Sequence, residues 1–121
     1  MRDFKKLDIW NNGILIVKHI YGLAGKLPNE EKFGLKGQLS RASVSVPSNI
    51  AEGCSRNSEL EFKRFLEIAL GSLFEVQTQL IISEELKFLN KSDLQSVFEL
   101  LEFEAKMINS LINKIKKVST F

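Results

Sequence analysis

The chain has 121 residues, of which 44% are hydrophobic and 26% charged, with a formal net charge of +2. This balance predicts one globular domain spanning residues 1–121 and excludes a disordered or low-complexity chain. The single cysteine, Cys54, excludes an intramolecular disulfide and favours a reducing compartment. No apolar run approaches the roughly 20 residues needed to cross a bilayer. We therefore expect a cytoplasmic protein without a membrane partner.

Apolar residues recur at spacings of three and four along the first half of the chain, which is the pattern of amphipathic helices. A first helix is predicted over residues 7–26, and Pro28 with Asn29 separates it from a second helix over residues 30–54. Pro47 lies inside the second helix, where its missing backbone donor should bend or interrupt the helix.

The second half of the chain shows the same periodicity. A Ser-x-x-Glu capping box opens a third predicted helix over residues 58–86, and a fourth covers residues 92–116. Gly71 and Ser72 cost the third helix about 1 kcal/mol of helix propensity against alanine, and close approach to another helix would explain them. Four helices with short connections predict an all-α, antiparallel up-down-up-down four-helix bundle.

Polar side chains share one face of the second predicted helix: Gln38, Arg41, Ser45, Asn49, Glu52 and Arg56. In an antiparallel hairpin, Arg41 comes level with Leu73 of the third helix, within reach of Ser72 and Glu75. Because a buried charge needs a partner, we hypothesise an Arg41–Glu75 ion pair within a hydrogen-bonded network joining the two helices.

The sequence lacks the residue patterns of common catalytic and metal sites. His19 is the only histidine, and in an up-down bundle it lies toward the opposite end from Cys54, which disfavours a Cys–His or Ser–His nucleophile. One histidine and one cysteine do not form a zinc site without several carboxylates. We predict no catalytic residues, no metal, no cofactor and no enzymatic activity. His19 is interpreted as a surface or subunit-contact residue and Cys54 as a loop thiol.

Charge is distributed unevenly between the two ends of the predicted bundle. The chain start, the turn between the second and third helices and the chain end meet at one end, which we call the basic pole. Nine cationic side chains lie there, against the acidic side chains of Asp3, Asp8, Glu59 and Glu61: Arg2, Lys5, Lys6, Arg56, Lys63, Arg64, Lys114, Lys116 and Lys117. At the other end the two signs balance.

Such a cluster favours polyanions through phosphate contacts and counterion release. It predicts binding to RNA or another nucleic acid without base readout, because interleaved aromatic residues for stacking are missing. Lysines near a helix C-terminus can instead simply complement the helix dipole. The alternative function is a structural protein–protein adaptor, in which the same charges and the polar face serve subunit or partner contacts.

Five motifs occur in order along nearly the whole chain: Phe4-Lys-Lys-Leu-Asp-Ile-Trp10, Pro28-x-x-Glu31-x-Phe-Gly-Leu35, Gln38-Leu-x-Arg-Ala-x-Val-Ser-Val-Pro-Ser-Asn-Ile-Ala-Glu-Gly53, Glu61-Phe-x-Arg-Phe-Leu66 and Ile68-Ala-x-Gly-Ser-Leu-x-Glu75. Together they resemble the bacterial four helix bundle protein family, whose members are encoded in intervening sequences of large-subunit rRNA genes.

The resemblance implies a homo-oligomeric ring, typically a pentamer, with no known enzymatic activity. It also implies a relation to the accessory variability protein of diversity-generating retroelements, a basic pentamer that binds nucleic acid and its reverse transcriptase. The matching positions are interpreted as fold and assembly determinants: Gln38, Arg41, Asn49, Glu52, Gly71, Ser72 and Glu75. We thus expect a non-enzymatic, ring-forming protein that binds nucleic acid or a nucleoprotein through the basic pole.

Overall fold

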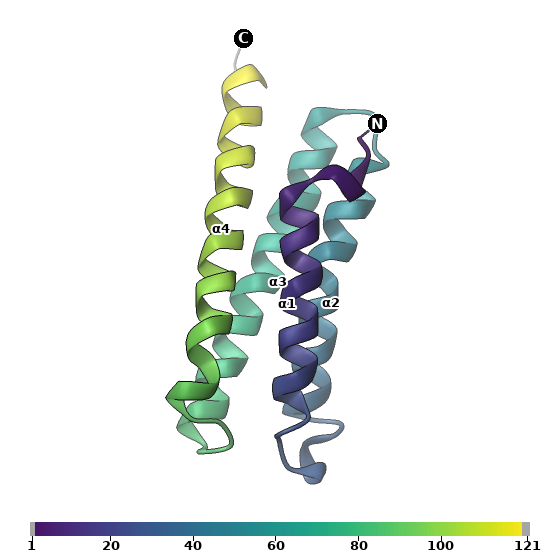
Figure 1. The fold of residues 1–121 in the computed structure, drawn as a ribbon. Helices are drawn as coiled ribbons and strands as arrows, with labels where there is room; N and C mark the ends of the chain where they lie inside the picture. The colour runs from purple at the N-terminus through teal and green to yellow at the C-terminus, as the bar shows by residue number, and fades with distance from the viewer. Residues whose placement is uncertain (1, 120–121) are drawn as a thin grey trace.

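Four α-helices account for most of the protein in a computed structural model that describes residues 2–119 (Figure 1). They are α1 (Asp8–Ala24), α2 (Leu35–Cys54), α3 (Glu59–Glu85) and α4 (Lys91–Ser119). Two short 3-10 helices, η1 (Phe4–Lys6) and η2 (Asn29–Glu31), precede α1 and α2. Residues 2–119 contain no strand, which confirms the prediction of an all-helical, four-helix protein.

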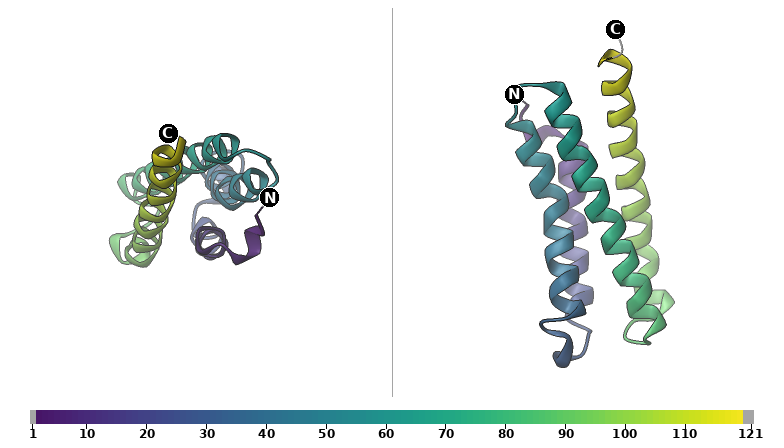
Figure 2. Two further views of the ribbon diagram at one scale, coloured as in Figure 1. Left: turned by 90° about the horizontal axis from the view of Figure 1, so that it is seen from above. Right: turned by 180° about the vertical axis from the view of Figure 1, so that it is seen from behind.

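Successive helices run in alternate directions in Figure 1, and the start of the chain, the α2–α3 turn and the end of α4 lie at the same end. α2 packs against α1 and α3, while α4 packs against α3 and α1. The backbones of α1 and α3 do not approach each other closely, and the two helices lie diagonally across the bundle (Figure 2). All four helices contribute to one core, which includes Ile16, Ile20, Leu39, Ile50, Leu66, Leu73, Leu101 and Ile108.

The beginning of α2 differs from the sequence-based bounds. Residues 30–34, which we predicted to be helical, form η2 and a turn, and α2 begins only at Leu35. The Glu31 carboxylate accepts the Leu35 backbone N–H at 3.1 Å, so a side chain four residues away satisfies this donor. A carboxylate at this position also complements the positive end of the helix dipole.

α2 continues without interruption through Pro47, which is buried against α1. A Cβ placed on Gly13 would lie 3.3 Å from the Pro47 Cβ, so α1 and α2 approach closely at this level. The proline leaves the carbonyl of Ser43 without its helical donor. A bend of α2 at Pro47 stays a prediction.

A second close approach joins α2 and α3 at Gly53. A Cβ there would lie 2.8 Å from the Phe65 Cβ and 3.1 Å from the Phe62 Cδ1, so only glycine fits. Close approach of another helix, which we expected at Gly71, is not found there within this chain, because a Cβ on Gly71 meets nothing within 4 Å.

α3 is long and apolar enough to meet the length and composition criteria for a membrane span. This corrects the statement that no segment of the chain approaches them. Between residues 65 and 83 only Glu67 and Glu75 are charged, because α3 carries apolar side chains on two faces. The inner face, with Leu66 and Leu73, builds the core, as expected for a core helix that passes the same criteria.

We expect Gly53→Ala to lower the free energy of unfolding by about 1–2 kcal/mol. Overpacking of the α2–α3 contact costs roughly 1–3 kcal/mol and outweighs the helix propensity gained, at most about 1 kcal/mol. Urea denaturation followed by circular dichroism measures the change. Ser48→Ala, on the exposed face of α2, is the control and should shift it by less than about 0.5 kcal/mol. Stabilisation by Gly53→Ala would contradict the close approach.

Candidate nucleic-acid interface

Arg2 ties the start of the chain to the α2–α3 turn. Its guanidinium donates to both carboxylate oxygens of Glu59, with an Nη2–Oε2 distance of 2.8 Å, and lies 4.1 Å from the centroid of the Phe62 ring. The hydrogen bond with Arg2 lowers the pKa of Glu59. The backbone N–H of Arg2 donates to the Cys54 carbonyl at 3.3 Å. The positive charge of Arg2 is therefore compensated within the chain itself.

Two more cations of the basic pole, one in the α2–α3 turn and one on α3, have acidic partners four residues away in the sequence. Arg56 Nη2 lies 3.5 Å from Glu52 Oε1, and Lys63 Nζ lies 3.6 Å from Glu67 Oε2. Such pairs on a helix surface contribute only a few tenths of a kcal/mol, so phosphates compete with them easily. Glu52 and Glu67 nevertheless join the acidic side chains of this end, so the excess of cations is smaller than predicted.

Four cations of the basic pole are exposed and form none of the ion pairs found among residues 2–119: Lys5, Lys6, Arg64 and Lys114. They come from η1, the first half of α3 and the last turns of α4, which lie at the same end of the bundle, although η1 itself packs only against α1 and α2 (Figure 1). Lys116 and Lys117 lie beyond Lys114 on the last turns of α4 and are exposed, although neither is free of interactions. The structure thus brings together cations from segments far apart in the sequence.

Hydroxyl and amide groups, not charges, connect the polar face of α2 to α3. The Ser45 and Ser72 hydroxyls lie 2.8 Å apart, and Asn49 Nδ2 donates to the Ser45 carbonyl at 2.8 Å and to its hydroxyl at 2.9 Å. The three side chains form a local network between the helices, as the sequence pattern predicted for Asn49 and Ser72.

Arg41 and Glu75 do not form the hypothesised ion pair among residues 2–119, and both side chains are exposed. The hypothesis assumed that the polar face of α2 points into the helix contact. Gln38 and Glu52 on that face are exposed too, so most of it faces outward and needs no buried counterion.

Cys54, which we interpreted as a loop thiol, is the last residue of α2 and is buried. Burial raises the pKa of its thiol, so the reactive thiolate is disfavoured. His19, interpreted as a surface or subunit-contact residue, is half-buried and lines a groove between α1 and α4.

A fully buried carboxyl group that sequence patterns did not single out lies between α1 and α4. Glu104 Oε1 accepts a hydrogen bond from Asn12 Nδ2 at 3.1 Å, and the same amide donates to the Leu100 carbonyl at 3.2 Å. The other oxygen, Oε2, has no hydrogen-bond partner in the described structure. Burial raises the pKa of Glu104 to about 7, although the Asn12 hydrogen bond opposes this shift. The sequence contained one signal for this burial: Glu104 lies at helical spacing from Leu101 and Ile108, on the same apolar face of the fourth helix.

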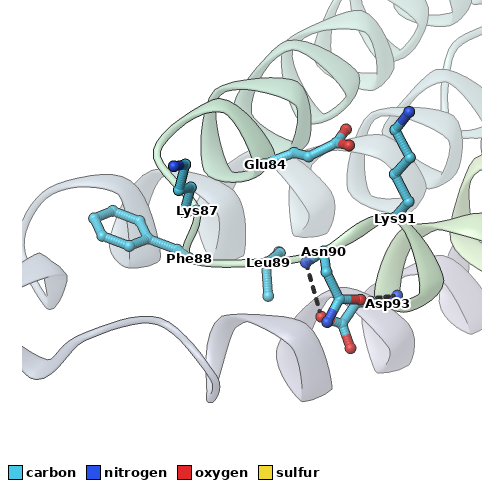
Figure 3. A pocket seen from close by; sticks show the side chains of 7 residues that line it. All are labelled: Glu84, Lys87, Phe88, Leu89, Asn90, Lys91 and Asp93. Atoms are coloured by element: carbon cyan, nitrogen blue, oxygen red, sulfur yellow. Dashed lines mark hydrogen bonds between the residues drawn. The ribbon is translucent and has the colours of Figure 1, made fainter.

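The α3–α4 turn forms a shallow hollow at the end opposite the basic pole (Figure 3). It is lined by Glu84, Lys87, Phe88, Leu89, Asn90, Lys91 and Asp93. Asn90 and Asp93 cap α4 reciprocally, each accepting the other's backbone N–H at 3.0 Å. The Asp93 carboxylate also forms an ion pair with Lys26, whose Nζ lies 2.8 Å from Asp93 Oδ1. Charges of both signs line the hollow, which gives it no preference for anions. Among residues 2–119, no group of three or more His, Cys, Asp or Glu side chains is placed to hold a metal ion.

The fold and these sites define a small all-helical bundle protein with cations gathered at one end and no enzyme family indicated. The chain belongs to the 23S rRNA-intervening sequence protein family, whose model matches residues 5–110. The resemblance seen in the five motifs is thereby confirmed at the level of this family. The relation to the accessory variability protein stays an expectation.

Comparison with solved structures shows the same fold in a crystal structure from Bacteroides thetaiotaomicron, described as a protein of unknown function from the S23 ribosomal protein family. The TM-score is 0.79 at 24% sequence identity, over 86% of this chain and 97% of that chain. No curated protein matches the chain.

We expect the stability of the protein to depend on the protonation of Glu104. Its pKa is about 7 in the folded protein and near 4.5 when exposed, so the native state binds more protons between these values. The free energy of unfolding should therefore fall as pH rises from about 4.5 to about 7, by up to about 3 kcal/mol, and then level off.

Glu104→Gln should remove this dependence and raise stability at pH 8, as measured by urea denaturation at several pH values. Glu102→Gln, on the exposed side of the same helix, is the matched control and should keep the wild-type slope. Parallel pH profiles for the wild type and Glu104→Gln would exclude this role of the buried carboxyl.

Proposed function

We propose that this protein is a non-enzymatic, oligomeric bundle that binds structured RNA through its basic pole. The observation that carries this proposal is the convergence of cations from three separate segments at one end of the bundle. Lys5, Lys6, Arg64 and Lys114 are exposed there without an acidic partner among the described residues. Cations in this arrangement gain affinity for phosphates by releasing condensed counterions.

Aromatic rings at the basic pole are engaged within the subunit, which favours contacts to the RNA backbone. Phe4 packs edge-on against Trp10, with ring centroids 5.2 Å apart. Arg2 covers Phe62, and the Arg56 guanidinium lies 4.9 Å from the centroid of Phe65. The described rings of the pole are thus already in contact with other side chains, which favours recognition of RNA by shape and phosphate contacts.

Family membership supports RNA as the polyanion, since the name of the family refers to intervening sequences of 23S rRNA. An oligomer would strengthen such binding, because each subunit adds its own cations to one surface. By resemblance the oligomer is a ring, typically a pentamer. Parallel subunits in a ring would present all basic poles on one face.

The second candidate function is a structural protein–protein adaptor. It is favoured by large apolar side chains that are exposed on α3 and at its C-cap: Leu60, Ile68, Phe74, Ile81, Ile82 and Leu86. Exposed apolar side chains in such number are typical of interaction surfaces. In this alternative the basic pole would serve protein contacts.

We expect an rRNA-type hairpin to bind with a dissociation constant that rises linearly with salt on a log–log scale. The triple variant Lys5→Gln, Lys6→Gln, Lys114→Gln should weaken binding at least about tenfold at 0.1 M salt and flatten the slope. Fluorescence anisotropy of labelled RNA measures both quantities.

A matched triple variant at the other end, Lys32→Gln, Lys36→Gln, Lys91→Gln, removes the same charge and should retain affinity. Equal losses in the two triple variants would show that only net charge matters. Absence of binding at low salt would reject RNA and leave the adaptor function.

A further inference from the structure

The segment before α1 lies at the surface of the bundle, yet it is tied down at both of its ends. None of residues 2–7 is buried, and only three of them form the short helix η1. Terminal segments of this kind are poorly ordered unless other parts of the chain hold them. We call residues 2–7 the N-terminal arm, which contains the first part of the motif Phe4-Lys-Lys-Leu-Asp-Ile-Trp10.

The first anchor joins the arm to the turn between α2 and α3 (Figure 1). The Arg2 backbone N–H donates to the Cys54 carbonyl at 3.3 Å, and the Arg2 guanidinium donates to both carboxylate oxygens of Glu59. Two parallel hydrogen bonds fix the orientation of a guanidinium as well as its position. Burial raises the pKa of the Cys54 thiol, and the charges of Arg2 and Asp3 act on the thiol as well, which places the arm beside it.

The second anchor is a side chain of α1. Asn11 Nδ2 donates to the carbonyls of Lys5 and Leu7, each at 3.0 Å, so one amide holds the other end of the arm. Asparagine is a poorer helix former than alanine, and Asn11 is exposed on a helix. Its two hydrogen bonds to the arm are therefore a physical reason for an asparagine at this position.

The two anchors determine where Lys5 and Lys6 stand, and this matters more than the charge of the arm. Asp3 lies before the two lysines and accepts the Lys5 backbone N–H at 3.1 Å, and Asp8 follows them in the first turn of α1. A freely moving arm would therefore offer phosphates little net charge. In the fixed arm, both lysines are exposed and form none of the ion pairs found among residues 2–119.

We propose that Arg2 and Asn11 are positioning residues for RNA binding, which hold the N-terminal arm so that Lys5 and Lys6 face the RNA phosphates in a fixed arrangement. Ordering a free arm on the RNA would cost conformational entropy, and the anchors remove this cost before binding. The inference rests on the proposed function. It gives Arg2 an indirect role through Glu59 in place of a direct contact with phosphate.

Glu59→Gln separates the two roles of Arg2, because they predict changes of opposite sign. The substitution makes the protein more positive and frees Arg2, so a direct contact between Arg2 and phosphate would tighten RNA binding. Under our proposal the arm is released, and the dissociation constant for the rRNA-type hairpin should rise about threefold or more at 0.1 M salt. Glu67→Gln is the matched control, since Glu67 also pairs with a cation of the basic pole, Lys63. It should bind at least as tightly as the wild type.

Asn11→Ala tests the second anchor without changing the charge of the protein. Alanine favours the helix, so circular dichroism should show α1 intact. The dissociation constant should nevertheless rise about threefold or more, because Lys5 and Lys6 lose their fixed position. Asn113→Ala, an exposed position of α4 at the same end of the bundle, is the control and should retain wild-type affinity.

The double variant Lys5→Gln, Lys6→Gln shows whether the anchors act through these two lysines. In that background, neither Glu59→Gln nor Asn11→Ala should weaken RNA binding further, because the arm no longer contributes cations. In the wild-type background, each anchor variant should also flatten the log–log dependence of binding on salt. A purely structural role of Arg2 and Asn11 would produce the same losses in both backgrounds and would contradict the proposal.

The thiol of Cys54 reports the position of the arm without RNA. Cys54 is the single cysteine of the chain and is 2% exposed. Its reaction with a disulfide reagent at pH 8 should be at least about threefold faster in Glu59→Gln and Asn11→Ala, because local opening of the arm uncovers it. The controls Glu67→Gln and Asn113→Ala should react at the wild-type rate.

Three results would overturn the proposal. Wild-type thiol rates in both anchor variants would show that Arg2 and Asn11 do not hold the arm. RNA binding that is unchanged or tighter in both variants would remove the positioning role and leave the proposed function in place. Absence of RNA binding by the wild type at low salt would reject the proposed function and this inference together.

Discussion

Close packing of α2 between α1 and α3 is the constraint on which the rest of the structure depends. Gly13 lets α1 approach Pro47, and Gly53 lets α3 approach through Phe62 and Phe65. The two contacts determine the relative heights of the three helices. They also bring the start of the chain beside the α2–α3 turn, where Arg2 bonds to the Cys54 carbonyl and to Glu59.

α4 packs beside the arrangement of α1, α2 and α3 and completes both the core and the basic pole. α4 contributes Leu101 and Ile108 to the core, and its last turns extend beyond the other helices at the end where the chain begins (Figure 1). It also brings the Glu104 carboxyl into the α1 contact, where Asn12 satisfies only one of its oxygens. The α4 contact therefore holds a buried carboxyl group, whereas the α2 contacts combine close packing at glycines with the Ser45–Ser72 hydrogen bond.

Charge on this protein separates into parts with different roles. Arg2 and Arg56 lie over aromatic rings and pair with acidic neighbours, so they stabilise the pole more than they enlarge its field. Lys5, Lys6 and Lys114 are exposed and form none of the ion pairs found among residues 2–119.

The sequence by itself determined the helices and the family, because helix periodicity is local and the five motifs span nearly the whole chain. It also located the cations at one end, since four antiparallel helices leave little freedom in which turns meet. Only the tertiary structure decided that Arg41 and Glu75 face outward, that Gly53 and not Gly71 is the close contact, and that Glu104 is buried. These outcomes depend on how far each helix is rotated against its neighbours, and a rotation of one residue moves a side chain by about 100°.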